Sequence, residues 1–94
     1  MTHIAETFTE FERNARAQGY DEVLERSWDP GQVVAIHSHP FDASAVVVKG
    51  EMWLIVGDDT RHIGTGGTFE LARGTPHSER YGSEGAVYWV ARRG

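Results

Sequence analysis

The sequence predicts an all-β domain, a sandwich or barrel, preceded by one short helix. Eleven glycines lie between short apolar runs in 94 residues, and turn residues recur at intervals of about eight to twelve residues, as in antiparallel sandwiches and barrels. The spacing of apolar residues changes at Gly19 from the period of a helix to that of a strand. We therefore expect one domain over residues 1–94, with a helix at about 6–18 and the barrel at about 20–92.

The N-terminal segment has the start, face and stop signals of a helix. Thr7 or Thr9 can cap it, because a glutamate stands three residues after each and would complete a capping box. Gly19 follows the last periodic residue, as expected for a helix C-terminus. The apolar residues that share one helical face are Ile4, Phe8, Phe11 and Ala15. This helix is expected to cover apolar surface of the β-structure.

After the helix, apolar or alternating runs indicate about seven to nine short strands. Glycine and proline turns separate them, and Lys49-Gly50-Glu51 is expected to be the turn of a hairpin. The runs expected to be strands are 20–28, 32–39, 45–48, 52–56, 60–63, 68–71, 77–81 and 86–92.

Composition excludes several classes of protein. The chain has no cysteine, which excludes disulfides, thiolate nucleophiles and cysteine-ligated zinc or iron–sulfur sites. The formal net charge of −5 disfavours non-specific binding to nucleic acid or anionic lipid. The N-terminus shows no basic and apolar signal-peptide pattern, and no apolar run is long enough to span a membrane. A cytoplasmic protein is expected.

Three of the five histidines have a spacing that suits a metal. His37 and His39 alternate within a strand-like run, so their side chains are expected on one face, about 6–7 Å apart at their origins. His77 opens another expected strand. Three imidazoles without thiols suit Fe, Zn, Ni, Mn or Cu better than Ca or Mg. An H-x-H pair is also common on solvated strands, so the pair alone leaves both interpretations open.

Two longer runs around these histidines resemble the two motifs of the cupin superfamily (RmlC-like proteins). The run from Gly31 to Gly50 places a glycine six positions before the H-x-H pair and ends on a glycine. The run from Gly66 to His77 follows the spacing G-x5-P-x-G-x2-H, with Ala72 in the place of the proline. The two motifs together cover residues 31–77. The resemblance implies an antiparallel jelly-roll barrel, or double-stranded β-helix, with a divalent metal at its mouth.

The resemblance also implies a ligand set. His37, His39 and His77 match the three metal-ligating histidines of the family. The family's fourth ligand is usually a glutamate, and Ala43 stands at that position here. Tyr81 stands where the second motif often ends in Asn. The missing glutamate removes a hard anionic ligand, which leaves the identity of the metal open and keeps loss of the metal possible.

Two carboxylates near the motifs could compensate for the missing glutamate. Glu79 lies two residues after His77 and shares its strand face. It would point into the barrel, where a charge is costly unless it is paired or functional. The alternative is a rim residue paired with Arg80 or Arg73. Asp42 has the opposite parity and is expected to be a turn residue after Pro40.

The remaining polar residues of interest are expected at the surface, and the aromatic residues in the core. His3 and His62 are expected to be solvated, and Arg92 and Arg93 to form a solvated tail. The aromatic residues expected to fill the barrel are Trp53, Phe69, Tyr81, Tyr88 and Trp89.

These features predict a metal-binding cupin that acts on a small organic molecule. An oxygenase acting on a diketone, thiol or phenol is the first expectation, with isomerase or decarboxylase chemistry next, and Glu79 as general base. The alternative is a non-catalytic ligand-binding module, because residues 75–79 resemble those of sensor cupins in bacterial transcription regulators. Edge strands and three tryptophans also favour a homodimer.

Overall fold

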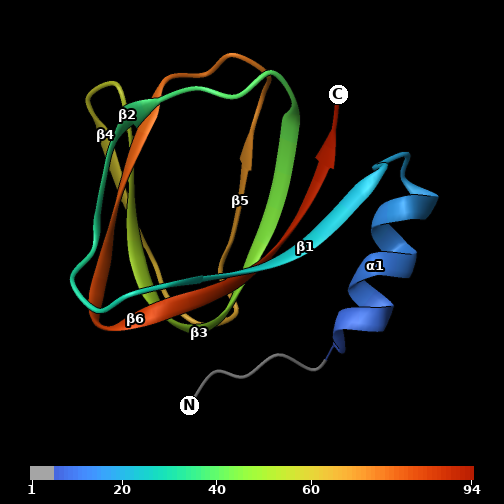
Figure 1. Ribbon diagram of the computed structural model, residues 1–94, viewed down its shortest axis with the longest axis horizontal. Coiled ribbons are helices and arrows are strands. Elements are labelled where there is room, and N and C mark those ends of the chain that lie inside the picture. The colour runs from blue at the N-terminus through green and yellow to red at the C-terminus, as the bar shows by residue number, and fades with distance from the viewer. Residues whose placement is uncertain (1–5) are drawn as a thin grey trace.

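Antiparallel strands curl into a barrel, and one helix lies outside it against β1, in this computed structural model, which describes residues 6–94 (Figure 1). The elements are α1 (Phe8–Ala17), β1 (Glu22–Trp28), β2 (Val33–His37), β3 (Asp42–Val56), β4 (Asp59–Ile63), β5 (Thr68–Leu71) and β6 (His77–Arg93). The predicted fold class, an antiparallel jelly roll with one N-terminal helix, is confirmed.

Two long strands, β3 and β6, hold the sheet together. β6 pairs with β1, β2 and β3, while β3 pairs with β4, β5 and β6, and every pairing is antiparallel. The pairing of β1 with β6 runs without a break from Glu22 opposite Arg92 to Trp28 opposite Ala86. The pairing of β2 with β6 places His37 directly opposite His77. The sheet therefore brings the two predicted metal motifs to the same place.

The hairpin expected at Lys49-Gly50-Glu51 is wrong. β3 continues through these residues, and its pairing with β6 shifts register on both sides of Gly50. Gly50 has a φ of +76°, and a Cβ on it would lie 2.1 Å from the carbonyl oxygen of Gly85. Gly85 likewise lies inside β6, at a φ of +74°. Both glycines lie at bends where a long strand turns a corner of the barrel. Such a bend and a hairpin turn both need a glycine with positive φ, so the sequence pattern of the two is the same.

The helix begins as predicted from one of its two candidate caps. Thr7 Oγ1 accepts the N–H of Glu10 at 3.1 Å, and the Glu10 carboxylate accepts the N–H of Thr7 at 2.9 Å. This hydrogen bonding holds the pKa of Glu10 below its usual range. Phe8 and Phe11 pack on Trp89, with ring centroids 5.6 and 5.9 Å apart. Ile4 and His3 lie outside the described residues.

The core lies inside the barrel, and only part of the predicted aromatic set belongs to it. Phe69, Tyr81 and Tyr88 are buried. Trp53 and Trp89 are half-buried, and they lie on the outer face of the barrel, because they have the opposite strand parity to the buried residues beside them. Their placement in the core was therefore wrong. The largest fully buried side chains are Tyr81, Met52 and Val47.

The strand β2 carries the exposed large apolar residues of the described chain, Val33 and Ile36, each 70% exposed. β2 pairs with β6 alone among the described strands. An exposed edge of this kind is compatible with the homodimer, which stays a prediction. Within residues 6–94, no helix is both long and apolar enough to cross a membrane.

Candidate metal centre

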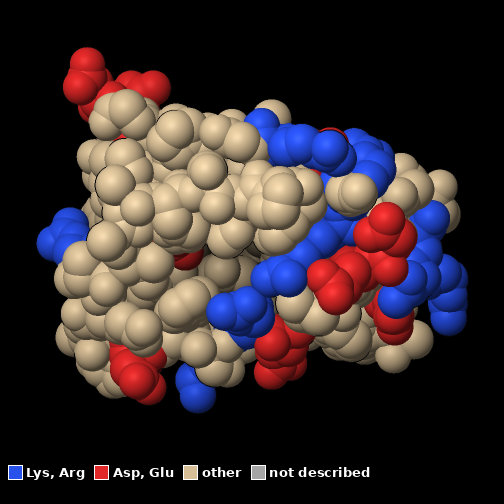
Figure 2. Space-filling view, turned by 45° about the horizontal axis from the view of Figure 1, so that its top comes forward, with Lys and Arg blue, Asp and Glu red and all other residues tan. Residues whose placement is uncertain are grey.

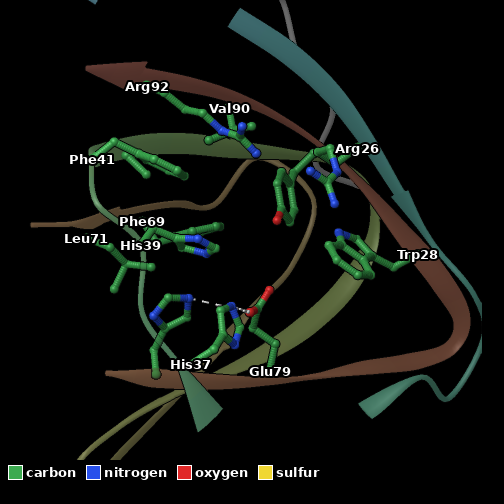
Figure 3. A pocket seen from close by; sticks show the side chains of 13 residues that line it. Arg26, Trp28, His37, His39, Phe41, Phe69, Leu71, Glu79, Val90 and Arg92 are labelled. Carbon is green, nitrogen blue, oxygen red and sulfur yellow. Dashed lines mark ion pairs between the residues drawn. The ribbon is translucent and has the colours of Figure 1, made fainter. Parts of the chain in front are cut away.

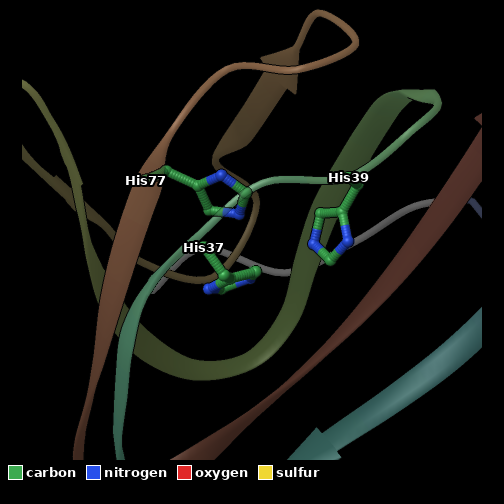
Figure 4. A group of neighbouring side chains, drawn as sticks. All are labelled: His37, His39 and His77. Atoms are coloured by element: carbon green, nitrogen blue, oxygen red, sulfur yellow. The ribbon is translucent and has the colours of Figure 1, made fainter.

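Three histidine rings meet inside one end of the barrel, as Figure 4 shows. His37 ends β2, His77 begins β6, and His39 lies in the connection between β2 and β3. The ring centroids of His37 lie 4.8 Å from those of His39 and 4.3 Å from those of His77, and the third separation is 5.2 Å. One nitrogen from each ring lies within 4.8 Å of the other two. The structure thus brings together all three histidines that the sequence singled out.

Backbone hydrogen bonds fix the orientation of two of these rings. His37 Nδ1 lies 2.7 Å from the carbonyl oxygen of Ala35, and His77 Nδ1 lies 2.9 Å from that of Thr75. A carbonyl oxygen only accepts, so each Nδ1 must carry the hydrogen and donate it. In the neutral rings, each Nε2 is then left with a free lone pair directed into the barrel. This is the arrangement in which protein histidines bind metal ions.

His39 differs from the other two histidines in its surroundings. Its ring stacks on Phe41 with centroids 4.8 Å apart and planes inclined by 18°. Burial lowers the pKa of His39 from its usual value, and the neighbouring His37, His77 and Arg92 lower it further. The ring therefore favours the neutral form, which is the form that ligates metals.

Glu79 points into the barrel beside these rings, and only 5% of it is exposed (Figure 3). Its Oε2 lies 3.4 Å from His37 Nε2 and 3.6 Å from His77 Nε2. Its Oε1 accepts the phenol O–H of Tyr81 at 2.5 Å. The inward position expected from strand parity is confirmed, and the alternative of a rim residue paired with Arg80 or Arg73 is wrong. Its catalytic role stays a prediction.

Two buried tyrosines stand behind the carboxylate. Burial is the main cause that raises the pKa of Tyr81, with Tyr88 and Glu79 adding to it. Burial likewise raises the pKa of Tyr88. Both phenols therefore stay protonated across the physiological range, and Tyr81 keeps its O–H as a donor to Glu79. Its ring also stacks on Trp28, with centroids 5.0 Å apart.

A cavity of about 70 Å³ opens next to the histidines. The residues that line it are Arg26, Trp28, His37, His39, Phe41, Ala43, Phe69, Leu71, His77, Glu79, Tyr88, Val90 and Arg92. The prediction of Arg92 as part of a solvated tail is therefore wrong. Tyr88, Val90 and Arg92 alternate along β6 on its inner face, so the parity of the strand could have placed Arg92 in the cavity. Arg26 shares the inner face of β1 with Trp28. The sequence analysis did not single it out, although strand parity could have placed it in the cavity as well.

The residues expected to lie away from the centre do so. Asp42 lies away from the centre, but the expectation that it is a turn residue is wrong, because β3 begins there. Its carboxylate accepts the backbone N–H of Arg73 at 2.8 Å and lies 3.7 Å from Arg93 Nε. His62 pairs with Glu51 on the exposed outer face, at 2.5 Å. Ala43, at the position of the family's glutamate, is buried and lines the cavity. A longer side chain at position 43 would thus enter the same cavity as Glu79.

The donor set fits a divalent transition metal. Three imidazole nitrogens and one carboxylate oxygen suit Mn, Fe, Ni, Cu or Zn. Metal–nitrogen bonds of about 2.0–2.2 Å place ligand atoms about 3.0–3.5 Å apart, and the imidazole nitrogens here lie within 4.8 Å. Small rotations of the rings would close that difference. His37 Nε2 and His77 Nε2 both face Glu79 Oε2, so with neutral rings and an ionised carboxylate all three atoms would offer lone pairs to the same point.

We compared the chain with known protein families, curated proteins and solved structures. Residues 25–91 match the cupin domain family. No match was found among curated proteins. A chain in crystal structures of the DMSP lyases RdDddP and RnDddQII is similar with a TM-score of 0.71 and 22% identity, over 77% of this chain and 37% of that one.

Two further solved structures show how widely this fold is used. Oxalate decarboxylase of Bacillus subtilis, which has Mn(II) centres, is similar with a TM-score of 0.68 and 23% identity, over 74% of this chain and 20% of its own. CENP-C of Drosophila melanogaster, bound to CAL1, is similar with a TM-score of 0.66 and 19% identity, over 76% and 60%. This chain therefore spans less than two thirds of each of these relatives, and at these identities the likeness shows the fold alone.

Proposed function

The chain belongs to the cupin family, and on that premise we propose that it is a metal-dependent enzyme acting on a small organic molecule inside the barrel. The observation that carries the proposal is the convergence of His37 Nε2 and His77 Nε2 on Glu79 Oε2, at 3.4 and 3.6 Å. Three acceptors held together in a largely buried site are costly unless a proton or a metal ion lies between them, and only a metal ion would engage all three histidines at once.

The proposed ligands are His37, His39 and His77, each through a ring nitrogen. When bound, the metal would act as a Lewis acid that polarises an oxygen of the substrate. The backbone carbonyls of Ala35 and Thr75 hold two of the rings in the ligating tautomer. Mn(II) or Fe(II) suits this set best, because the nearby carboxylate is a hard donor.

Glu79 is proposed to take or return a proton of the bound molecule. Its Oε1 is held by the Tyr81 O–H, which leaves Oε2 directed at the histidines and the cavity. Among the described residues, Glu79 is the only carboxylate that lines the cavity. A carboxylate beside a polarised oxygen supports proton transfer at the adjacent carbon. The geometry therefore supports isomerase, lyase or decarboxylase chemistry more directly than the oxygenase chemistry expected first from the sequence.

The alternative is a ligand-binding module without turnover. CENP-C, with the same fold, was solved bound to CAL1, so the fold alone does not imply catalysis. Under this alternative, the barrel would still bind a small molecule, but the three histidines would not need to retain a metal.

Elemental analysis of the protein as purified tests the proposal. We expect close to one Mn, Fe, Ni, Cu or Zn per chain, which a His37→Ala/His39→Ala/His77→Ala variant loses while remaining folded by circular dichroism. The His62→Ala variant is the matched control, because His62 also contacts a glutamate but lies on the outer face. Protein with no metal, or a triple variant that binds added metal as tightly as the parent, would overturn the enzyme proposal and favour the module.

A further inference from the structure

Two arginines line the wall of the cavity that faces the histidines. Arg26 comes from β1 and Arg92 from β6, and Figure 3 shows both guanidinium groups directed inward, across the cavity from His37 and Glu79. Neither residue belongs to the proposed metal ligands. Arginine is an uncommon lining for a small cavity with aromatic and aliphatic walls, because burying part of its charge is costly without an anion.

Arg92 is held in place without being fully neutralised. Its guanidinium carbon lies 4.6 Å from the ring centre of Phe41, and Nη1 lies 3.2 Å from a carboxylate oxygen of Glu22. Glu22 is 53% exposed, so solvent screens this pair. The Nε of Arg92 is buried and has no hydrogen-bond partner within the described residues.

Arg26 has no carboxylate partner at all among the ion pairs of residues 6–94. Its guanidinium carbon lies 5.2 Å from the ring centre of Trp28. Stacking on an aromatic ring fixes the plane of a guanidinium and leaves its N–H edge free to donate. A planar carboxylate is the ligand that matches such an edge best.

Charge and size narrow the class of ligand further. With a dication on the histidines, the lining would carry two guanidinium groups and one carboxylate, so positive charge is in excess. Figure 2 shows Lys and Arg side chains beside a hollow in one face of the molecule, with Asp and Glu side chains among them. The volume of about 70 Å³ holds about five to seven water-sized groups, at roughly 10–15 Å³ each. The ligand is thus a small anion with a short apolar body.

From these observations we infer that the barrel binds a small organic carboxylate, with its carboxylate on Arg26 and Arg92 and a hydroxyl or carbonyl oxygen toward the three histidines. The inference rests on the proposed function for the second contact only. Phe41, Phe69 and Leu71 would cover the apolar body of the ligand between the two polar ends.

The test compares 2-hydroxypropanoate with its neutral amide on the Co(II)-loaded protein. The two probes have nearly the same shape and share the hydroxyl, and they differ in the charge of the carboxylate. Because a carboxylate can also bind Co(II), the loss of the preference in the arginine variants carries the test. We expect the acid to bind at least about tenfold more tightly by calorimetry, with a change in the visible Co(II) spectrum. Arg26→Met and Arg92→Met are each expected to remove most of this preference while both variants still bind Co(II).

Arg80→Met is the matched control. Arg80 also stacks on a tryptophan, with its guanidinium carbon 4.5 Å from the ring centre of Trp53, but it does not line the cavity. Should Arg92→Met fail to fold, Arg26→Met and Arg92→Lys decide the matter, because Lys keeps the charge but not the two-pronged N–H edge. Equal binding of acid and amide by the parent protein would overturn the inference.

A metal-free arm separates this inference from the proposed function. In metal-free protein, the acid is expected to shift the Nε–H resonances of Arg26 and Arg92 in NMR spectra, and the amide is not. A protein that fails to bind Co(II) but shows these shifts would lose the proposed function and keep the anion site. A protein that binds Co(II) and shows neither the shifts nor the acid preference would lose the anion site alone.

Discussion

The molecule has histidine–glutamate contacts in two places, and they differ in solvent exposure and in the hydrogen bonds of their histidines. His62 and Glu51 meet at 2.5 Å on the outer face, with side chains 53% and 43% exposed. Glu79 meets His37 and His77 at 3.4 and 3.6 Å inside the barrel, where it is 5% exposed. The outer contact is closer, yet the inner one has the geometry of a functional site.

The two kinds of contact differ in the hydrogen bond that the other ring nitrogen, Nδ1, makes. His37 and His77 use Nδ1 to donate to backbone carbonyls, so the Nε2 atoms that face Glu79 are acceptors in the neutral rings. No hydrogen bond of this kind fixes His62 within the described residues, and water can reach both members of its pair. The outer contact is thus an ordinary surface pair, whereas the inner one gathers three buried or half-buried acceptors that a metal ion or a proton between them would stabilise.

Removing a histidine of the inner contact should have the largest effect on metal affinity. His77→Ala is expected to weaken metal binding by at least about 100-fold, because only two imidazole donors remain. The metal-dependent gain in stability should disappear with it, since a ligand stabilises only the state that binds it. Metal titration against a chelator measures the first effect, and thermal unfolding with and without metal measures the second.

Moving the carboxylate from position 79 to position 43 tests from which side of the cavity it can support metal binding. Glu79→Gln is expected to weaken metal binding by about 10–100-fold, which is the range for groups that support a metal site. Ala43→Glu in the same protein places a carboxylate at the family's usual position and should recover most of that loss. Affinities of parent, single and double variants complete the comparison. No recovery in a folded double variant would mean that position 43 cannot reach the metal.

The same Glu79→Gln change should act in the opposite direction on the metal-free protein. The new amide N–H can donate to His37 Nε2 or His77 Nε2, while its oxygen still accepts from Tyr81. Replacing a clash of acceptors by a hydrogen bond should stabilise the metal-free barrel by about 1 kcal/mol, or about 4–8 °C in Tm. A lower Tm for the metal-free variant would indicate instead that a protonated histidine already donates to Glu79.

Breaking the outer contact should have the smallest effect. His62→Ala and Glu51→Ala are each expected to change the free energy of unfolding by less than about 1 kcal/mol, with no additional loss in the double variant at high salt. Metal affinity should stay within twofold of the parent, roughly the scatter expected of a distant surface change. Urea unfolding at two salt concentrations measures this prediction.

How far the sequence could anticipate the structure depended on the kind of signal. Strand parity placed Glu79 beside His77, because parity depends on regular local geometry. The meeting of His37 with His77 was implied by the resemblance to the two cupin motifs, since no local pattern shows that β2 pairs with β6. The turn signal at Gly50 misled, since a glycine with positive φ serves equally in a hairpin and in a bent long strand. The tail expected at Arg92 is wrong because β6 continues to Arg93, so Arg92 keeps the inward parity of Tyr88 and Val90.

The central place of β6 has a consequence for how the barrel folds. β6 pairs with β1, β2 and β3, and one of its ion pairs joins Arg92 to Glu22, 70 residues away. Such distant pairings make folding slow, on a scale of about milliseconds to seconds, because long loops must close before contacts form. His77 opens β6 and lies opposite His37 of β2, so the three histidines meet only when β6 docks. The rate at which a metal probe is captured during refolding should therefore follow the rate of barrel closure.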